Sequence, residues 1–96
     1  FGRMVCITFR GVSDERVQFC AETLARAMRE RLPESVTVSG PAPAPLARAK
    51  GQYRHQVLFR GPSVSAITGP LRRLVQETRW PAGVTVALDV DPVSLT

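Results

Sequence analysis

The sequence lacks the features that mark a membrane segment, a disulfide scaffold or a metal centre. No apolar run approaches the roughly 20 residues that cross a bilayer, and the opening stretch is too short and too interrupted by arginine for a signal peptide. The two cysteines, Cys6 and Cys20, belong to no Cys-x-x-Cys or Cys/His spacing, and the chain has one histidine. We therefore expect reduced core thiols, no metal site, no membrane contact and a cytoplasmic location.

Motifs for nucleotide chemistry are missing as well. The chain contains no GxxxxGK[ST] loop and no acidic magnesium-binding box in a helicase context. We therefore expect no catalytic residue, no ATP site and no cofactor in this chain.

Positive charge is what the chain has in excess. Thirteen basic residues stand against eight acidic ones, for a net charge of +5, and all but one of the basic residues are arginine. Such a surplus favours binding to polyanions, most simply nucleic acid. A GC-rich genome also enriches arginine, so charge alone leaves both explanations open.

The apolar pattern predicts four strands and two helices. Alternation indicates strands at 3–10, 36–39, 53–60 and 84–91, whereas helical spacing indicates helices over 14–32 and from the N-cap Ser63 to about residue 80. Gly69-Pro70 should kink or divide the second helix. Residues 40–45 read as a stiff extended segment rich in proline, and residues 46–51 as a loop.

The order strand, helix, strand, strand, helix, strand predicts an α+β fold. Right-handed crossovers give the ferredoxin-like split βαββαβ arrangement, a four-stranded antiparallel sheet with two helices on one face. The length suits one domain spanning residues 1–96. Which face of the third strand is buried stays open: one carries Tyr53, His55, Val57 and Phe59, the other Arg54, Gln56, Leu58 and Arg60.

Several polar and aromatic residues have an ordinary structural interpretation. We expect His55 to be a buried imidazole with a partner, Trp80 to pack or dock, and Asp89 and Asp91 to pair with arginines. A carboxylate pair at those two positions could instead bind a cation.

Three segments together resemble a known family. They are Gly40-Pro-Ala-Pro-Ala-Pro-Leu46, Gly51-Gln-Tyr-Arg-His-Gln-Val-Leu58 and Val86-Ala-Leu-Asp-Val-Asp-Pro92. With the opening Phe1-Gly2-Arg3, they resemble the C-terminal domain of the PriA helicase family, also called primosomal protein N-prime. The chain would then be one domain of a longer ATP-dependent 3′-5′ DNA helicase that reloads the replisome at stalled forks. The family's C-terminal domain has a fold similar to a small-subunit ribosomal protein.

The resemblance also implies partners. In the family this domain helps to hold single-stranded or branched DNA. It packs against the remaining domains of the helicase, near a pocket for the acidic tail of single-stranded-DNA-binding protein. Where some members present an arginine and a glutamine to that tail, this chain has Val64 and Thr68, so a docking contact would rest on other residues such as Arg72 and Arg73.

Arg48, Lys50 and Arg54 are the candidate nucleic-acid-binding residues. They surround the proline-stiffened segment, and guanidinium groups on a rigid loop suit phosphate oxygens. An alternative is a docking module without direct DNA contact. A small acylphosphatase-like enzyme is the other alternative, but that chemistry uses an asparagine and the chain contains none.

Overall fold

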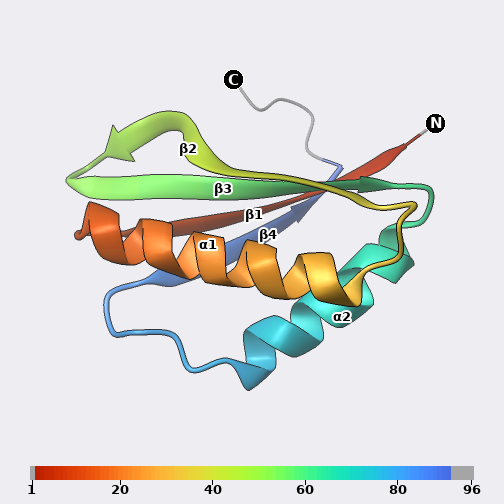
Figure 1. Ribbon diagram of the computed structural model, residues 1–96. Helices are drawn as coiled ribbons and strands as arrows, with labels where there is room; N and C mark the ends of the chain where they lie inside the picture. The colour runs from red at the N-terminus through yellow and green to blue at the C-terminus, as the bar shows by residue number, and fades with distance from the viewer. Residues whose placement is uncertain (1, 92–96) are drawn as a thin grey trace.

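The computed structural model describes residues 2–91, which form a four-stranded antiparallel sheet with two helices packed on one side (Figure 1). In chain order the elements are β1 (Arg3–Gly11), α1 (Asp14–Arg31), β2 (Thr37–Ala49), β3 (Gln52–Gly61), α2 (Val64–Glu77) and β4 (Thr85–Val90). The strand order across the sheet is β2-β3-β1-β4. This confirms the predicted ferredoxin-like split βαββαβ arrangement.

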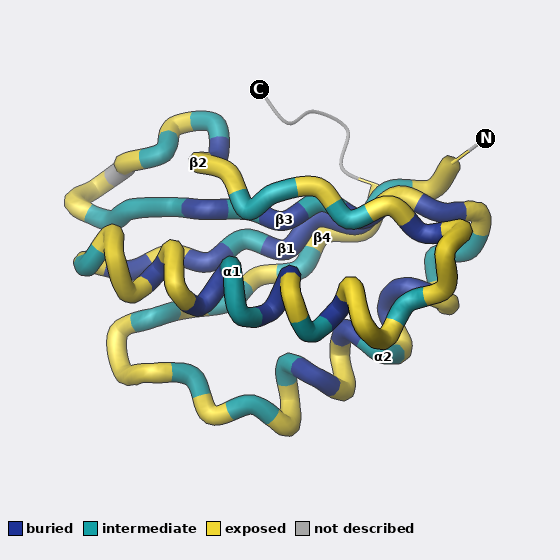
Figure 2. Tube along the Cα trace, viewed as in Figure 1, coloured by how far each residue is buried: buried dark blue, intermediate teal, exposed yellow. Residues whose placement is uncertain are grey.

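The face of the sheet that meets the helices, here called the covered face, holds the core. Val5 pairs with Phe59 and Ile7 with Val57 across β1 and β3, and all four side chains are fully buried. Figure 2 shows the buried residues following these two central strands and the inner sides of the helices. The buried face of β3 is therefore the one that also carries His55. This answers the question, left open by the sequence, of which face of the third strand is buried.

The opposite side of the sheet, which neither helix covers, is here called the open face. Alternation along the strands and the observed register place its side chains there. They are Met4, Cys6, Thr8 and Arg10 of β1, Thr37 and Ser39 of β2, Arg54, Gln56, Leu58 and Arg60 of β3, and Thr85, Ala87 and Asp89 of β4.

Helix α1 is well specified by its sequence. Ser13 caps it as predicted, because its hydroxyl accepts a hydrogen bond from the Arg16 backbone N–H at 3.3 Å. Its apolar stripe is buried on the sheet, and Arg29 donates to the Gly40 carbonyl of β2 at 2.8 Å. The helix is thus tied to both the core and the edge strand.

Helix α2 runs through Pro70 as one element, so of the two predicted outcomes, a kink or a division, the division is wrong. Its inner side buries Ile67, Leu71 and Leu74. Neither described helix is long and apolar enough to cross a bilayer.

Strand β2 is the main departure from the sequence prediction. The segment expected to be a short strand, a stiff stretch and a loop is one irregular strand that stays paired with β3 as far as Ala49. It bulges between Ser39 and Ala42 and again between Pro43 and Arg48, and its later part curls away from the helices (Figure 1). The bulges accommodate prolines, which cannot donate to a continuous ladder.

Two glycines make this irregular hairpin possible. Gly40 has a φ of 100°, and a Cβ there would lie 2.9 Å from the Gln56 carbonyl oxygen. At the hairpin tip, Lys50 and Gly51 have φ values of 54° and 76° between the paired Ala49 and Gln52. Positive φ at both central residues is the geometry of a type I′ turn, which joins adjacent strands directly.

Candidate nucleic-acid interface

Arg48, Lys50 and Arg54, here called the basic hairpin, lie at one end of the β2–β3 hairpin. Arg48 pairs with Tyr53 in the ladder, and its guanidinium carbon lies 5.0 Å from the centre of that ring. Lys50 is exposed at the turn. The structure therefore brings the three residues to the same end of the molecule.

They do not share one face. Arg54 follows Tyr53 on β3, so its side chain is on the open face, whereas Arg48 is on the side of Tyr53. The Arg54 guanidinium donates to the Pro45 carbonyl at 3.1 Å, which holds it against the bulge of β2. Among residues 2–91, the ion pairs join Arg3 to Asp91 and Asp14 to His55, so the basic hairpin uses no carboxylate within the described chain.

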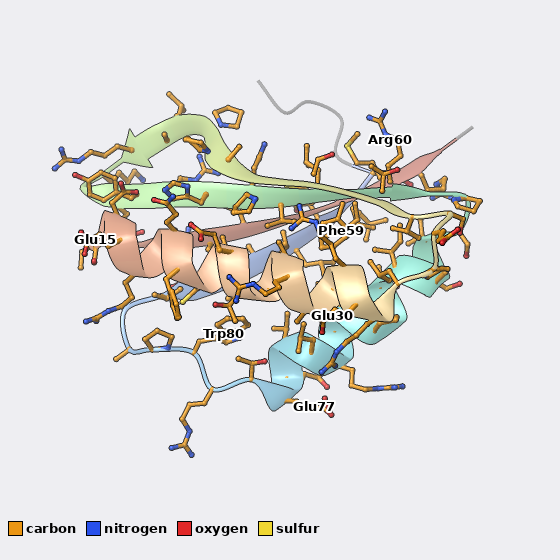
Figure 3. The ribbon with its side chains drawn as sticks, viewed as in Figure 1. Glu15, Glu30, Phe59, Arg60, Glu77 and Trp80 are labelled. Atoms are coloured by element: carbon orange, nitrogen blue, oxygen red, sulfur yellow. The ribbon has the colours of Figure 1, made fainter. Side chains whose placement is uncertain are left out.

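The open face carries two further arginines that the sequence analysis did not single out. Arg10 of β1 is directly opposite Arg54 of β3, and Arg60 lies at the other end of the same strand. Figure 3 shows Arg60 on the open side and Phe59, the residue before it, between sheet and helices. Alternation along β3 already placed Arg54 and Arg60 on the same face of the strand. The sequence did not show whether that face is exposed, and only the β1–β3 register shows that Arg10 is opposite Arg54.

The middle of the open face is less basic. Here the Cys6 thiol donates to the Gln56 carboxamide oxygen at 3.6 Å, and Asp89 of β4 is opposite Cys6. Burial raises the pKa of Cys6 above its ordinary value, and the Asp89 charge adds to this, whereas a hydrogen bond with Thr8 and the charge of Arg54 act in the opposite direction. Cys6 and Cys20 are both free and buried, as expected, and burial also raises the pKa of Cys20.

A hollow of about 260 Å³ lies beside Arg60. Its lining residues are apolar, hydroxyl-bearing or basic: Met4, Leu58, Phe59, Thr37, Ser39 and Arg60. The aliphatic part of Arg60 lies against Gly2, where a Cβ would come within 2.9 Å of the Arg60 Cγ. The close backbone of Gly2 thus supports the arginine that borders the hollow.

The candidate docking residues of α2 fall into two sets. Arg72 and Arg73 are exposed, as a contact with a partner requires. Thr68 is 8% exposed and Val64 is half-buried against the core. Both of these side chains therefore offer little surface, and the arginines are the accessible members.

Arg72 also borders a groove between α2 and β4. The α2–β4 groove has a volume of about 240 Å³, and its lining is mainly apolar: Ile7, Val75, Val86 and Leu88, with Arg72 and Gln76. On the outer end of the same β4 face, Val90 is 40% exposed. Helix α2 thus leaves part of the covered face of β4 accessible.

The polar residues outside these surfaces are structural. His55 is 8% exposed, and its Nε2 lies 2.6 Å from Asp14 Oδ1 at the start of α1, so the prediction of a buried imidazole with a partner is confirmed. Asp91 lies just beyond β4, pairs with Arg3 and accepts the Met4 backbone N–H at 2.9 Å. The Arg3 hydrogen bond, then that N–H, hold the pKa of Asp91 below its ordinary value. Within residues 2–91, no group of three or more His, Cys, Asp or Glu residues could hold a metal ion.

Trp80 is a packing residue. Its ring meets Phe9 edge-on with centroids 5.3 Å apart, and its Nε1 donates to the Val75 carbonyl at 3.2 Å. Figure 3 shows it beneath α1, beyond the end of α2. Tyr53 is half-buried under Arg48. The sheet therefore presents no exposed aromatic on its open face among the described residues.

Comparison with known sequences gives a consistent set of relatives. A family model described as the primosomal protein N C-terminal domain matches residues 1–93. The chain is 34% identical over 95 residues to the replication restart protein PriA of Treponema pallidum, covering 99% of this chain and 14% of that protein. It is 32% identical to the Synechocystis protein of the same name, covering 99% of this chain and 11% of that protein. The chain thus spans a small part of these relatives.

A solved structure shows the fold independently. The de novo designed protein Foldit4 has a TM-score of 0.70 to this chain at 16% identity, with 98% of this chain and all of that one covered. At this identity the likeness concerns the fold alone. The family match over nearly the whole sequence carries the relationship: the chain belongs to the family of primosomal protein N C-terminal domains, found in the replication restart protein PriA.

Proposed function

We propose that this chain is a DNA-binding and partner-docking domain of a replication-restart helicase. It would hold single-stranded or branched DNA in the cytoplasm without a cofactor of its own. ATP hydrolysis would belong to other domains of the longer protein. The family relationship supports the assignment to a replication-restart helicase, and the basic hairpin supports the contact with DNA.

The observation that carries the proposal is the placement of Arg48, Lys50 and Arg54 at one protruding end. The stacking on Tyr53 and the hydrogen bond to Pro45 limit the freedom of the two arginines. Guanidinium groups held in this way lose little entropy when they bind phosphate. Such contacts are made with the phosphate backbone of DNA, so the affinity should be independent of the DNA sequence and strongly dependent on salt.

The test replaces Arg48, Lys50 and Arg54 together with alanine. Affinity for a labelled single-stranded oligonucleotide, measured by fluorescence anisotropy, should fall by about tenfold or more at low salt. Each lost phosphate contact removes about 0.7 from the slope of log K against log salt, so the slope should flatten by up to about 2.

A matched control changes three exposed residues on the outer side of α1, Arg16, Arg26 and Arg31, to alanine. It removes the same charge, and a small loss of affinity is expected from the lower net charge alone. If the hairpin variant keeps the salt slope of the parent chain, these residues do not bind DNA.

A second candidate function is docking without DNA contact. It is supported by the α2–β4 groove, whose apolar floor and Arg72 rim suit a segment that combines an apolar side chain with carboxylates. The occupant would be the acidic tail of single-stranded-DNA-binding protein or another domain of the same helicase.

An acidic tail peptide, titrated in the same anisotropy assay, tests this candidate. Arg72→Ala should weaken peptide binding several-fold and leave DNA binding nearly unchanged. Arg73→Ala is the matched control, because Arg73 is exposed on the same helix but does not line the groove. Equal losses in the two variants would remove the groove from the binding site.

A further inference from the structure

The geometry points to a binding track for single-stranded DNA along β3 on the open face of the sheet, with Arg60 at one end and the Arg10–Arg54 pair at the other. This inference rests on the proposed DNA-binding function and extends it from the hairpin end across the sheet. It assigns binding to Arg10 and Arg60, which lie outside the basic hairpin.

Charge is the first argument. The open face carries three arginines and a single carboxylate, Asp89, among the described residues. Arg10, Arg54 and Arg60 form no ion pair within residues 2–91. The outer side of α1, by contrast, mixes both signs: Glu15, Arg16, Glu22, Arg26, Glu30 and Arg31. A polyanion would therefore be attracted to the open face more than to the helices.

The Arg10–Arg54 pair is the second argument. Like charges directly opposite each other on neighbouring strands destabilise a sheet. The structure nevertheless places Arg10 and Arg54 opposite each other, and the Arg54 guanidinium is held toward the bulge of β2 by its hydrogen bond to the Pro45 carbonyl. A phosphate bound by both guanidinium groups would offset their like charges with two charge-assisted hydrogen bonds, and the Thr85 hydroxyl opposite Arg10 could add a third donor.

The distribution along β3 favours a single strand. Arg54 and Arg60 are six residues apart on one face, or about 20 Å at roughly 3.4 Å per residue, which is long enough for a few nucleotides. Between the charged ends lie Leu58 and Gln56, with Met4 beside the hollow. Apolar and amide groups flanked by arginines suit exposed bases flanked by phosphates, and only an unpaired strand exposes its bases.

The hollow beside Arg60 supplies the features that a base requires. Met4 and Leu58 offer apolar contact to its flat face, whereas Thr37 and Ser39 offer hydroxyls at its edge. Asp89 lies on the β4 side of the face, so it would repel phosphates and keep the backbone toward β3. No aromatic stacking contributes, so binding should be weaker than in single-strand binders that use it.

The decisive experiment compares two double variants of this chain, both measured with labelled oligo-dT of about ten nucleotides at two salt concentrations. Arg10→Gln/Arg60→Gln removes charge from the open face, whereas Arg26→Gln/Arg31→Gln removes the same charge from α1. We expect the dissociation constant to rise by about fivefold or more for the first and by less than about twofold for the second. Arg54 is left unchanged because it also supports the bulge of β2.

The possible results separate this inference from the proposed function. Equal effects of the two double variants, with the parent chain still binding DNA, would overturn the track and leave the basic hairpin as the site. Absence of salt-dependent binding by the parent chain would overturn both. Binding of duplex DNA as tightly as the single strand would overturn the assignment to an unpaired strand.

A second measurement does not depend on the folding of any variant. In an amide NMR titration of the unchanged chain with the same oligonucleotide, the largest shifts should fall on open-face residues such as Thr8, Gln56 and Leu58. Shifts concentrated on α1 would contradict the track.

Discussion

The two faces of the sheet divide two tasks between alternate residues of the same strands. Phe59 is fully buried under the helices, whereas Arg60 is exposed on the other side. The same contrast separates Phe9 from Arg10 on β1. The residues that stabilise the core are thus on the covered face of the central strands, and the candidate binding groups are on the open face.

The difference has a physical consequence for substitutions. A side chain on the covered face fills a packed layer, so shortening it leaves a cavity. A side chain on the open face borders solvent, so its loss costs little packing energy and mainly alters binding. Neighbouring residues on β3 should therefore respond to mutation in different assays.

The largest effect is expected for Phe59→Ala. Because Phe59 is fully buried in the core, its truncation should lower the free energy of unfolding by about 3–5 kcal/mol. Leu58→Ala is the matched control: its half-buried side chain on the open face should cost about 1 kcal/mol. Urea denaturation measures both. Similar losses for the two variants would contradict the division between the faces.

A smaller effect is expected for Asp14→Ala, which tests the polar contact within the covered layer. The change leaves the buried His55 imidazole without its 2.6 Å partner and should lower the free energy of unfolding by about 1–3 kcal/mol.

Glu15→Ala is the matched control. It separates the loss of the Asp14–His55 hydrogen bond from the loss of a negative charge at the N-terminus of α1. Glu15 lies in the same first turn of α1, and its removal should cost only about 0.3–1 kcal/mol. Chemical denaturation near neutral pH measures both variants, and equal costs would show that the His55 contact adds nothing.

Most of the fold followed from the sequence because periodicity and local signals agree. The apolar stripe of α1, its Ser13 cap and the alternation of β1 specify their elements locally. Strand β2 did not follow, because its pairing depends on bulges around prolines and on a tight turn at Lys50-Gly51. A proline-rich segment is predicted to be a loop when its partner strand is not known.

The candidate site was only partly accessible to sequence reasoning. Adjacency in the chain identified the basic hairpin, but strand alternation sends Arg48 and Arg54 to different faces. Arg10 and Arg54 are far apart in sequence and meet only through the β1–β3 register. Long-range register is decided by packing of the whole core, so the open-face arginines became visible as a group only in the structure.

The smallest effect is expected for Asp91→Asn at the exposed end of the sheet. The hydrogen bond from Arg3, then the Met4 N–H, lower the pKa of Asp91 in the folded chain. Because the folded pKa is below the unfolded one, the stabilisation is present above the ordinary value of 3.8 and is lost as pH falls through the folded pKa. The variant should therefore melt slightly below the parent near pH 7, with the gap narrowing as the pH falls below 3.8 and shrinking in high salt.

Thermal melts near pH 7 and at a series of acid pH values measure this difference, and Asp89→Asn is the matched control on the open face. Asp89 forms no ion pair within residues 2–91, so its replacement should not reproduce that closing gap. If the gap for Asp91→Asn stays constant as the pH falls below 3.8, the carboxylate does not stabilise this end of the sheet through its charge.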